Sequence, residues 1–204
     1  MKTIAIQKNA SIQNVRMLTM TAVLSAIAFV LAFFEFPVPL PPSFARMDLS
    51  DLPALIGAFA YGPISGVLIE LVKNALQLPT TSTSGIGELA NFIMGSSFVV
   101  TAGLIYKFYK TKKMAIIACL TASIIMGIVA AIVNYFILLP LFEAFMPLDQ
   151  QIASFGECIP FIRTKLDIVL FNAFPFNLLK GIGISIVTML IYKNLAPFLK
   201  GSQK

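Results

Sequence analysis

Long apolar segments separated by short polar stretches make up most of this sequence. The first unbroken run, Met17 to Phe34, has 18 residues, which is enough for a helix to cross about 30 Å of hydrocarbon. Comparable segments recur to the end of the chain, and we predict an all-α integral membrane protein with six transmembrane helices in a single domain. The expected spans are approximately 16–35, 50–61, 63–78, 88–107, 114–142 and 166–192.

The second and third spans are unusual because they are short. Leu52 to Tyr61 cannot cross a bilayer alone, and Gly62-Pro63 breaks the helix before the apolar pattern resumes. Short segments of this kind occur where the backbone packs against protein or lines a cavity. Within the third segment, Glu70 and Lys73 lie at i and i+3, so we predict a structural ion pair there rather than a ligand site.

The composition supports a membrane location. Of the 204 residues, 58% are hydrophobic and only 12% are charged, whereas a soluble domain carries about 25% charged residues. The mean hydropathy is +0.89. The basic start leads into the first apolar run without a small-residue cleavage pattern, so we expect the first helix to be retained.

The net charge of +6 follows the predicted topology rather than a nucleic-acid surface. Cations without accompanying acids flank the spans on one side, and most acidic residues fall in the opposite loops. Because cytoplasmic loops carry the excess of lysine and arginine, both termini are predicted to be cytoplasmic. The cations on that side are Lys2, Lys8, Arg16, Lys107, Lys110, Lys112, Lys113, Lys193, Lys200 and Lys204. The acids of the opposite loops are Glu35, Asp48, Asp51, Glu88, Glu143, Asp149, Glu157 and Asp167.

A few polar residues interrupt the apolar segments and are the candidate site. Asn177 and Lys180 share one face of the last helix, and Asn134 lies at a similar depth in the fifth. Polar groups at this depth are costly unless they find partners. They either line a ligand pocket or bind the helices to one another. Glu70 is the one carboxylate expected well inside the membrane, so the sequence offers no chain of carboxylates for an ion pathway.

The loops and the first helix supply further candidates. The proline-rich stretch 35–50 predicts a stiff, extended loop, and its apolar side chains Leu40 and Met47 suit a lid over an external pocket. Glu88 lies in the first turn of the fourth span, where it either complements the helix dipole or contacts a ligand. Ala22 and Ala26 follow the four-residue spacing of small side chains that lets another helix approach closely.

Several function classes are excluded by what the sequence lacks. It contains no histidine and only two cysteines, so the usual zinc and haem ligand sets cannot form, and no metal site is expected. Catalysis by a histidine base is excluded as well. No phosphate-binding loop of the Walker type is present, so this chain does not hydrolyse ATP itself.

The motifs together resemble a known family, the substrate-binding S-components of energy-coupling factor (ECF) transporters, and most closely the riboflavin-specific ones. The resemblance covers nearly all of the chain after the first dozen residues. It rests on the segments 47–63, 85–91, Asn134-Tyr135 and Asn177-Leu-Leu-Lys180.

The resemblance implies a multi-pass protein of the bacterial cell membrane that binds riboflavin from outside without catalysis and without a cofactor. Its partners would be an integral T-component and two cytoplasmic ATPases. The implied ligand contacts are Asn134, Asn177, Lys180, Glu88, Leu40 and Met47, and the implied T-component contacts are Ala22 and Ala26. Whether flavin mononucleotide also binds is left open by the sequence.

Three alternatives stay open at this point. The chain could be an S-component for another vitamin, because the pocket rather than the architecture sets the ligand. It could be an assembly subunit whose buried polar residues only join helices. A membrane-embedded enzyme such as a lipid transferase is the third, although the lack of histidine, paired intramembrane aspartates and metal motifs argues against it.

Overall fold

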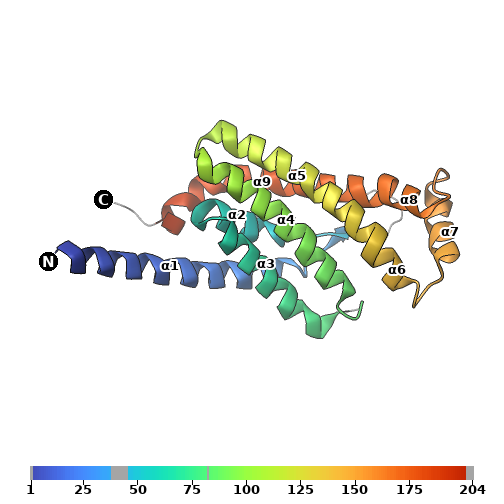
Figure 1. Ribbon diagram of the computed structural model, residues 1–204, viewed down its shortest axis with the longest axis horizontal. Coiled ribbons are helices and arrows are strands. Elements are labelled where there is room, and N and C mark those ends of the chain that lie inside the picture. The colour runs from blue at the N-terminus through green and yellow to red at the C-terminus, as the bar shows by residue number, and fades with distance from the viewer. Residues whose placement is uncertain (1, 38–45, 82, 201–204) are drawn as a thin grey trace.

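The computed structural model describes residues 2–37, 46–81 and 83–200, and within them the fold is helical apart from one pair of two-residue strands. Long helices lie alongside one another in an elongated bundle (Figure 1). The α-helices are α1 (Lys2–Leu31), α2 (Asp51–Tyr61), α3 (Pro63–Gln77), α4 (Ile86–Phe108), α5 (Lys112–Val133), α6 (Leu139–Phe142), α7 (Leu148–Cys158), α8 (Lys165–Ile168) and α9 (Phe174–Lys200). The remaining elements are the antiparallel strands β1 (Phe36–Pro37) and β2 (Arg46–Met47), a 3-10 turn η1 (Leu78–Thr80), and two π-helical segments, η2 (Asn134–Leu138) and η3 (Val169–Ala173).

Four helical stretches of the described chain are long and apolar enough to cross a membrane. They lie in α1, in α4, in the continuous rod from α5 to α6, and in the rod from α8 to α9. Their bounds are Asn14–Leu31, Ile86–Phe108, Lys112–Phe142 and Lys165–Tyr192.

The short helix α2 forms the centre of the bundle. It packs against α1, α3, α4 and α9, and every residue from Asp51 to Phe59 is buried. A helix that is apolar on all sides is stable only when protein surrounds it. The predicted break after α2 is present: Gly62 has φ 102°, a value that favours glycine, and Pro63 then begins α3.

Each π-helical segment precedes a proline. Pro140 is the second residue of α6 and Pro175 the second residue of α9. A proline has no N–H for the carbonyl four residues before it, and that carbonyl lies within the π-helical segment in both cases. The wider π turn absorbs this defect, and such turns are frequent at functional sites.

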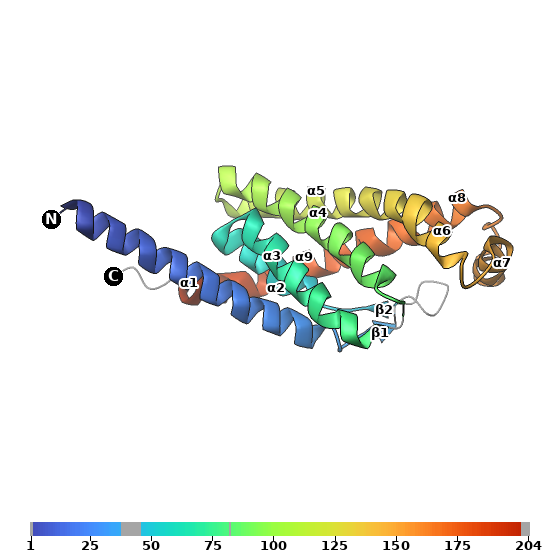
Figure 2. The same cartoon turned by 60° about the horizontal axis from the view of Figure 1, so that its bottom comes forward.

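Helix α1 runs along one side of the bundle (Figure 2), and its small residues fall on two different faces. Ala28 and Ala32 are buried against the bundle, with 0% and 4% of their surface exposed. Ala22 and Ala26, the predicted docking residues, are exposed. The second face is therefore exposed in the described chain.

The segment 143–167 is more ordered than the sequence suggested. The spans expected from the sequence leave residues 143–165 as a connection between two membrane helices, but this connection contains α7, which packs at the end of the bundle opposite the start of α1 (Figure 1). Ile152 and Phe155 lie on one side of α7, Ile159 follows directly after its end, and all three pack against a second cluster of buried residues. That spacing is the helical signal, and it is weak because only a few apolar residues carry it.

Candidate ligand site

A polar cavity of about 380 Å³ lies where the start of α4 meets η2, η3 and the first turns of α9. Four residues predicted from the sequence line it: Asn134, Asn177, Lys180 and Glu88. They come from three separate helical rods. The remaining lining residues are Glu35, Asp48, Gln77, Thr83, Gly87, Asn91, Met94, Leu138, Asn172, Ala173 and Phe176.

The two asparagine side chains are held by their own helices. Asn134 donates from Nδ2 to the carbonyl of Ala130 at 2.8 Å, and Asn177 donates to the carbonyl of Ala173 at 2.9 Å. Each bond fixes the orientation of an amide that can both donate and accept. The cavity wall is thus set before any ligand arrives.

Lys180 lies deep in this wall, with about 5% of its surface exposed. Its Nζ is 3.0 Å from Asp51 Oδ2 and 3.7 Å from Asp48 Oδ2. It also donates to Asn91 Oδ1 at 3.4 Å. A buried ammonium group needs such partners, because burying an unpaired charge is far more costly than burying a paired one.

Asp51 joins Lys180 to a second buried lysine. Its other oxygen, Oδ1, is 2.5 Å from the Nζ of Lys73. Lys73 is also 2.7 Å from Glu70 Oε2, which confirms the predicted ion pair, and it donates to Ser50 Oγ at 3.0 Å. The side chains of Asp51, Glu70 and Lys73 are fully buried.

Two asparagines close these interactions into a ring. Asn91 donates to Asn74 Oδ1 at 3.2 Å, and Asn74 donates to Glu70 Oε2 at 3.4 Å. The ring passes through α2, α3, α4 and α9, so it fixes the floor of the cavity relative to the bundle core. Gly95 makes room for it, since a Cβ there would lie 2.6 Å from Glu70 Oε2.

Asp51 corrects an expectation from the sequence. The charge pattern assigned it to an outer loop and left Glu70 as the one carboxylate well inside the membrane. In the structure Asp51 is the first residue of α2 and has no exposed surface. The available signal was charge balance: with Lys73 and Lys180 both at depth, Glu70 alone leaves one ammonium group without a partner.

Glu88 both stabilises the start of α4 and lines the polar cavity. It lies in the first turn of α4 and accepts hydrogen bonds from Thr81 Oγ1 at 2.9 Å and Thr83 Oγ1 at 3.2 Å. Thr83 Oγ1 in turn accepts from the N–H of Gly87 at 3.0 Å. The hydroxyl-rich loop before α4 is thereby ordered around a carboxylate that also lines the cavity.

An apolar cavity of about 520 Å³ adjoins the polar one and shares four lining residues with it: Asn134, Leu138, Asn172 and Phe176. Its other walls come from α6, α7 and the connection between them. They carry Leu139, Phe142, Phe145, Met146, Gln151, Ser154 and Phe155. The two cavities together offer a polar end and a largely aromatic end, which suits an amphiphilic small molecule.

The other predicted residues take different positions. Met47 lies in β2, where it pairs with Phe36 of β1, and it is not among the cavity-lining residues that the structure describes. Leu40 lies outside the described residues. Cys119 is a buried free thiol. Over residues 2–37, 46–81 and 83–200, no group of acidic or sulfur side chains has the arrangement of a metal site.

This sequence and fold match a known protein family and a solved structure. The family described as "ECF transporter, substrate-specific component" matches residues 16–192. A solved structure titled as the structure and mechanism of the S component of a bacterial ECF transporter superimposes with a TM-score of 0.74 and 40% sequence identity. That match covers 93% of this chain and 99% of the solved one.

Curated relatives are similar over almost their whole length. The riboflavin transporter RibU of Staphylococcus aureus (strain TCH60) is 41% identical, over 92% of this chain and 94% of the relative. The riboflavin transporter FmnP of Bacillus subtilis (strain 168) is 33% identical, over 92% and 95%. The RibU of Streptococcus thermophilus is 30% identical, over 96% and 90%.

Proposed function

This chain belongs to the family of substrate-specific components of ECF transporters, and we propose from this premise that it binds riboflavin and mediates its uptake. Relatives named as riboflavin transporters align over more than 90% of the chain. The family is one of transporter components, so the protein is a multi-pass protein of the cell membrane and not an enzyme.

The observation that carries the ligand assignment is the pair of adjoining cavities. Riboflavin has a flat aromatic ring system with one apolar and one polar edge, and a side chain of hydroxyl groups. The polar cavity offers the amides of Asn134 and Asn177, the ammonium group of Lys180 and the carboxylate of Glu88. The apolar cavity offers phenylalanine side chains. Pockets that are mostly apolar with a few placed polar groups bind such molecules.

The energy for uptake is proposed to come from partners. We infer a complex with an integral T-component and two cytoplasmic ATPases, because the family is defined by such transporters and this sequence has no Walker motif of its own. The exposed face with Ala22 and Ala26 is the proposed contact with the T-component. Leu40 and Met47 remain proposed lid residues.

The proposed topology has six membrane helices and cytoplasmic termini. Supporting it, the start of α1, the end of α9 and the connection between α4 and α5 lie at the same end of the bundle (Figure 1). The lysines of that connection are the cations that the positive-inside rule places in the cytoplasm. The two cavities then open towards the outside.

A spectroscopic titration tests the function directly. The protein purified in detergent is expected to carry a yellow flavin, or to quench the fluorescence of added riboflavin at nanomolar concentrations. A colourless protein that leaves riboflavin fluorescence unchanged would contradict the proposal and favour another vitamin. The assembly-subunit alternative predicts that Asn177→Leu and Lys180→Met lower stability in a protein that binds no flavin at all.

A further inference from the structure

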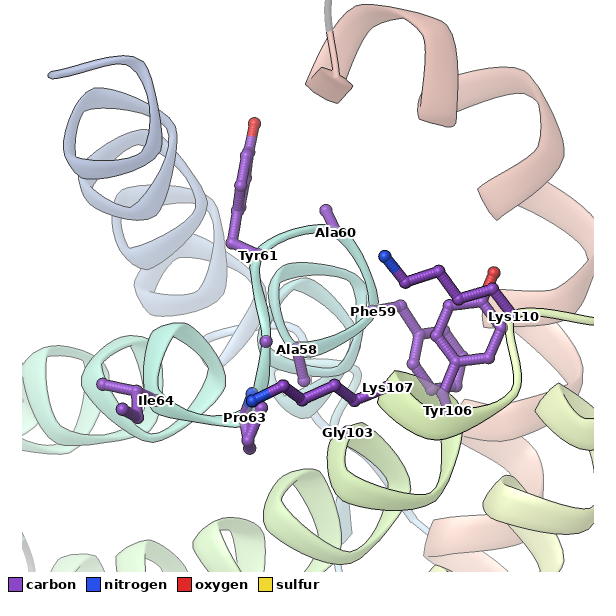
Figure 3. Close-up of a pocket in the computed structure, with 11 residues that line it drawn as sticks. Ala58, Phe59, Ala60, Tyr61, Pro63, Ile64, Gly103, Tyr106, Lys107 and Lys110 are labelled. Atoms are coloured by element: carbon purple, nitrogen blue, oxygen red, sulfur yellow. The ribbon is translucent and has the colours of Figure 1, made fainter. Parts of the chain in front are cut away.

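A third cavity, of about 260 Å³, is lined by residues of α2, α3 and the end of α4 (Figure 3). It lies at the opposite end of the bundle from the polar cavity, which the first turns of α4 line. It forms where α2 stops, Gly62 and Pro63 turn the chain, and α4 ends alongside. The helices approach closely there, because a Cβ on Gly103 would lie 3.1 Å from Pro63 Cα. Nothing in the proposed riboflavin function uses this cavity.

Two lysine side chains overhang the cavity. Figure 3 shows Lys107 extending towards Pro63 and Lys110 extending towards Phe59. No residue that lines the cavity is acidic. Within the described ranges, neither lysine forms an ion pair. The two ammonium groups therefore bring positive charge to one concave surface without a counter-charge from the protein.

Helix capping accounts for only part of this arrangement. Lys107 lies in the last turn of α4, where a cation complements the helix dipole. Lys110 lies beyond the end of that helix, so the dipole gives no reason for it to turn over the cavity. The first turn of α3, at Pro63, adds the partial positive charge of a helix N-terminus on the same side.

The surroundings of the cavity are apolar and face outwards. Ile64 lines it and has 75% of its surface exposed, and Leu68, one turn further along the same side of α3, is 41% exposed. Such side chains at the end of a membrane helix fit acyl chains better than they fit water.

We propose that this cavity binds the phosphate headgroup of an anionic membrane phospholipid. The ammonium groups of Lys107 and Lys110 would hold the phosphate, and the acyl chains would lie against Ile64 and Leu68. Lysine binds phosphate as a point charge, and basic pockets between membrane helices on the cytoplasmic side take anionic headgroups. A free phosphate shares this chemistry, but it would leave the apolar rim uncovered.

The test compares two double variants of equal charge. Lys107→Gln with Lys110→Gln removes the cavity lysines, whereas Lys112→Gln with Lys113→Gln removes two lysines that are also exposed but do not line the cavity. Native mass spectrometry then measures phosphatidylglycerol binding against equimolar phosphatidylcholine. Each lysine near anionic lipid contributes about 1 kcal/mol, so the first variant should weaken binding by about tenfold to thirtyfold, and the second by much less.

A third variant tests the cavity without changing its charge. Ala60 lines it and is half-buried, and Ala60→Trp should fill the space and weaken phosphatidylglycerol binding with both lysines present. Circular dichroism and melting temperature check that each variant is folded. If both lysine variants lose phosphatidylglycerol binding equally, the binding depends on general surface charge and not on this cavity, and the proposal is overturned.

Two further outcomes would show that the lysines bind a soluble phosphate or a protein partner instead of a lipid. If inorganic phosphate displaces the lipid and by itself raises the melting temperature of the unaltered protein but not of the first variant, the site takes a soluble phosphate. If the first variant keeps phosphatidylglycerol binding but loses complex formation with the other transporter subunits, the lysines form a protein contact. Either result contradicts the lipid assignment.

Discussion

At the scale of single residues, Lys180 connects the ligand cavity to the core of the bundle. It lines the cavity, and its ammonium group is held by Asp51, which also holds Lys73. A flexible lysine side chain loses much conformational entropy when it is fixed on binding. Here the ion-pair partners already hold the Lys180 side chain in place, so its conformational entropy does not have to be lost when a ligand binds.

Loss of either predicted polar contact should weaken riboflavin binding while the protein stays folded. Lys180→Ala and Asn177→Ala each remove a group from the cavity wall. A lost hydrogen bond to a buried ligand group costs about 1–3 kcal/mol, or roughly one to two decades in affinity. Quenching of riboflavin fluorescence measures this, and the matched control is Asn194→Ala, an exposed amide on the same helix. Unchanged affinity in both cavity variants would refute the site.

Asp51→Asn should cost stability as well as affinity. The substitution leaves Lys73 and Lys180 without their shared carboxylate inside the bundle, and breaking a buried ion pair by removing one partner costs about 3–5 kcal/mol. We expect a clearly lower melting temperature in detergent. Asp149→Asn, an exposed acid in α7, is the control. Equal melting of the two variants would show that the ring around Asp51 contributes little.

At the scale of elements, the π-helical segment η3 brings to one cavity two asparagines that a regular helix would separate. Successive residues of an α-helix are rotated by about 100°, so a π turn shifts the face that the residues before it present. Asn172 lies in η3 and Asn177 follows in α9, and both line the same cavity. The proline after η3 is the sequence feature that favours this irregularity.

Pro175→Ala should therefore weaken riboflavin binding although position 175 does not line either ligand cavity. Alanine supplies the missing N–H, so the carbonyl of Phe171 can accept a regular bond and η3 can revert to α-helix. Asn172 would then rotate away from the cavity, with a loss of about fivefold in affinity if its contact is worth about 1 kcal/mol. Fluorescence titration measures the loss, and wild-type affinity would mean that η3 persists without the proline.

Enlarging the exposed face of α1 should abolish uptake and spare ligand binding. Ala22→Trp and Ala26→Trp add bulk to a surface that is exposed in the described chain, so the folded protein should accommodate it. The close approach of another helix would be blocked. Riboflavin uptake by cells and fluorescence quenching by the purified variant measure the two effects. Leu120→Trp, on an exposed position of α5, is the control, and normal uptake in both alanine variants would remove the docking role.

At the scale of the whole molecule, the sequence predicted most of what depends on local pattern. The helical fold, the break at Gly62-Pro63 and the common depth of Asn134, Asn177 and Lys180 follow from apolar spacing and chain length. Asp51 was missed because its burial depends on the surrounding helices, which no local pattern reveals. The helix α7 was missed for a similar reason. Its few apolar residues are stabilised by packing against a buried cluster from other elements, and the local sequence does not show that cluster.

Orientation in the membrane decides which solution reaches the ligand cavities, and it can be measured with single cysteines. In a background with Cys119→Ser and Cys158→Ser, we expect Ala153→Cys in α7 to react with a membrane-impermeant thiol reagent in intact cells. Thr111→Cys, between α4 and α5, should react only after the cells are permeabilised. Both positions are exposed, so a difference reports sidedness rather than burial.

The physical basis of this expectation is the charge distribution. All nine acidic residues lie outside the segment 89–142, which contains Thr111 and the four lysines around it, and such a connection is retained in the cytoplasm. The opposite labelling pattern would turn both ligand cavities towards the cytoplasm. Capture of riboflavin from outside would then be impossible in this conformation, and the cavity proposed to bind a lipid headgroup would face the outer leaflet.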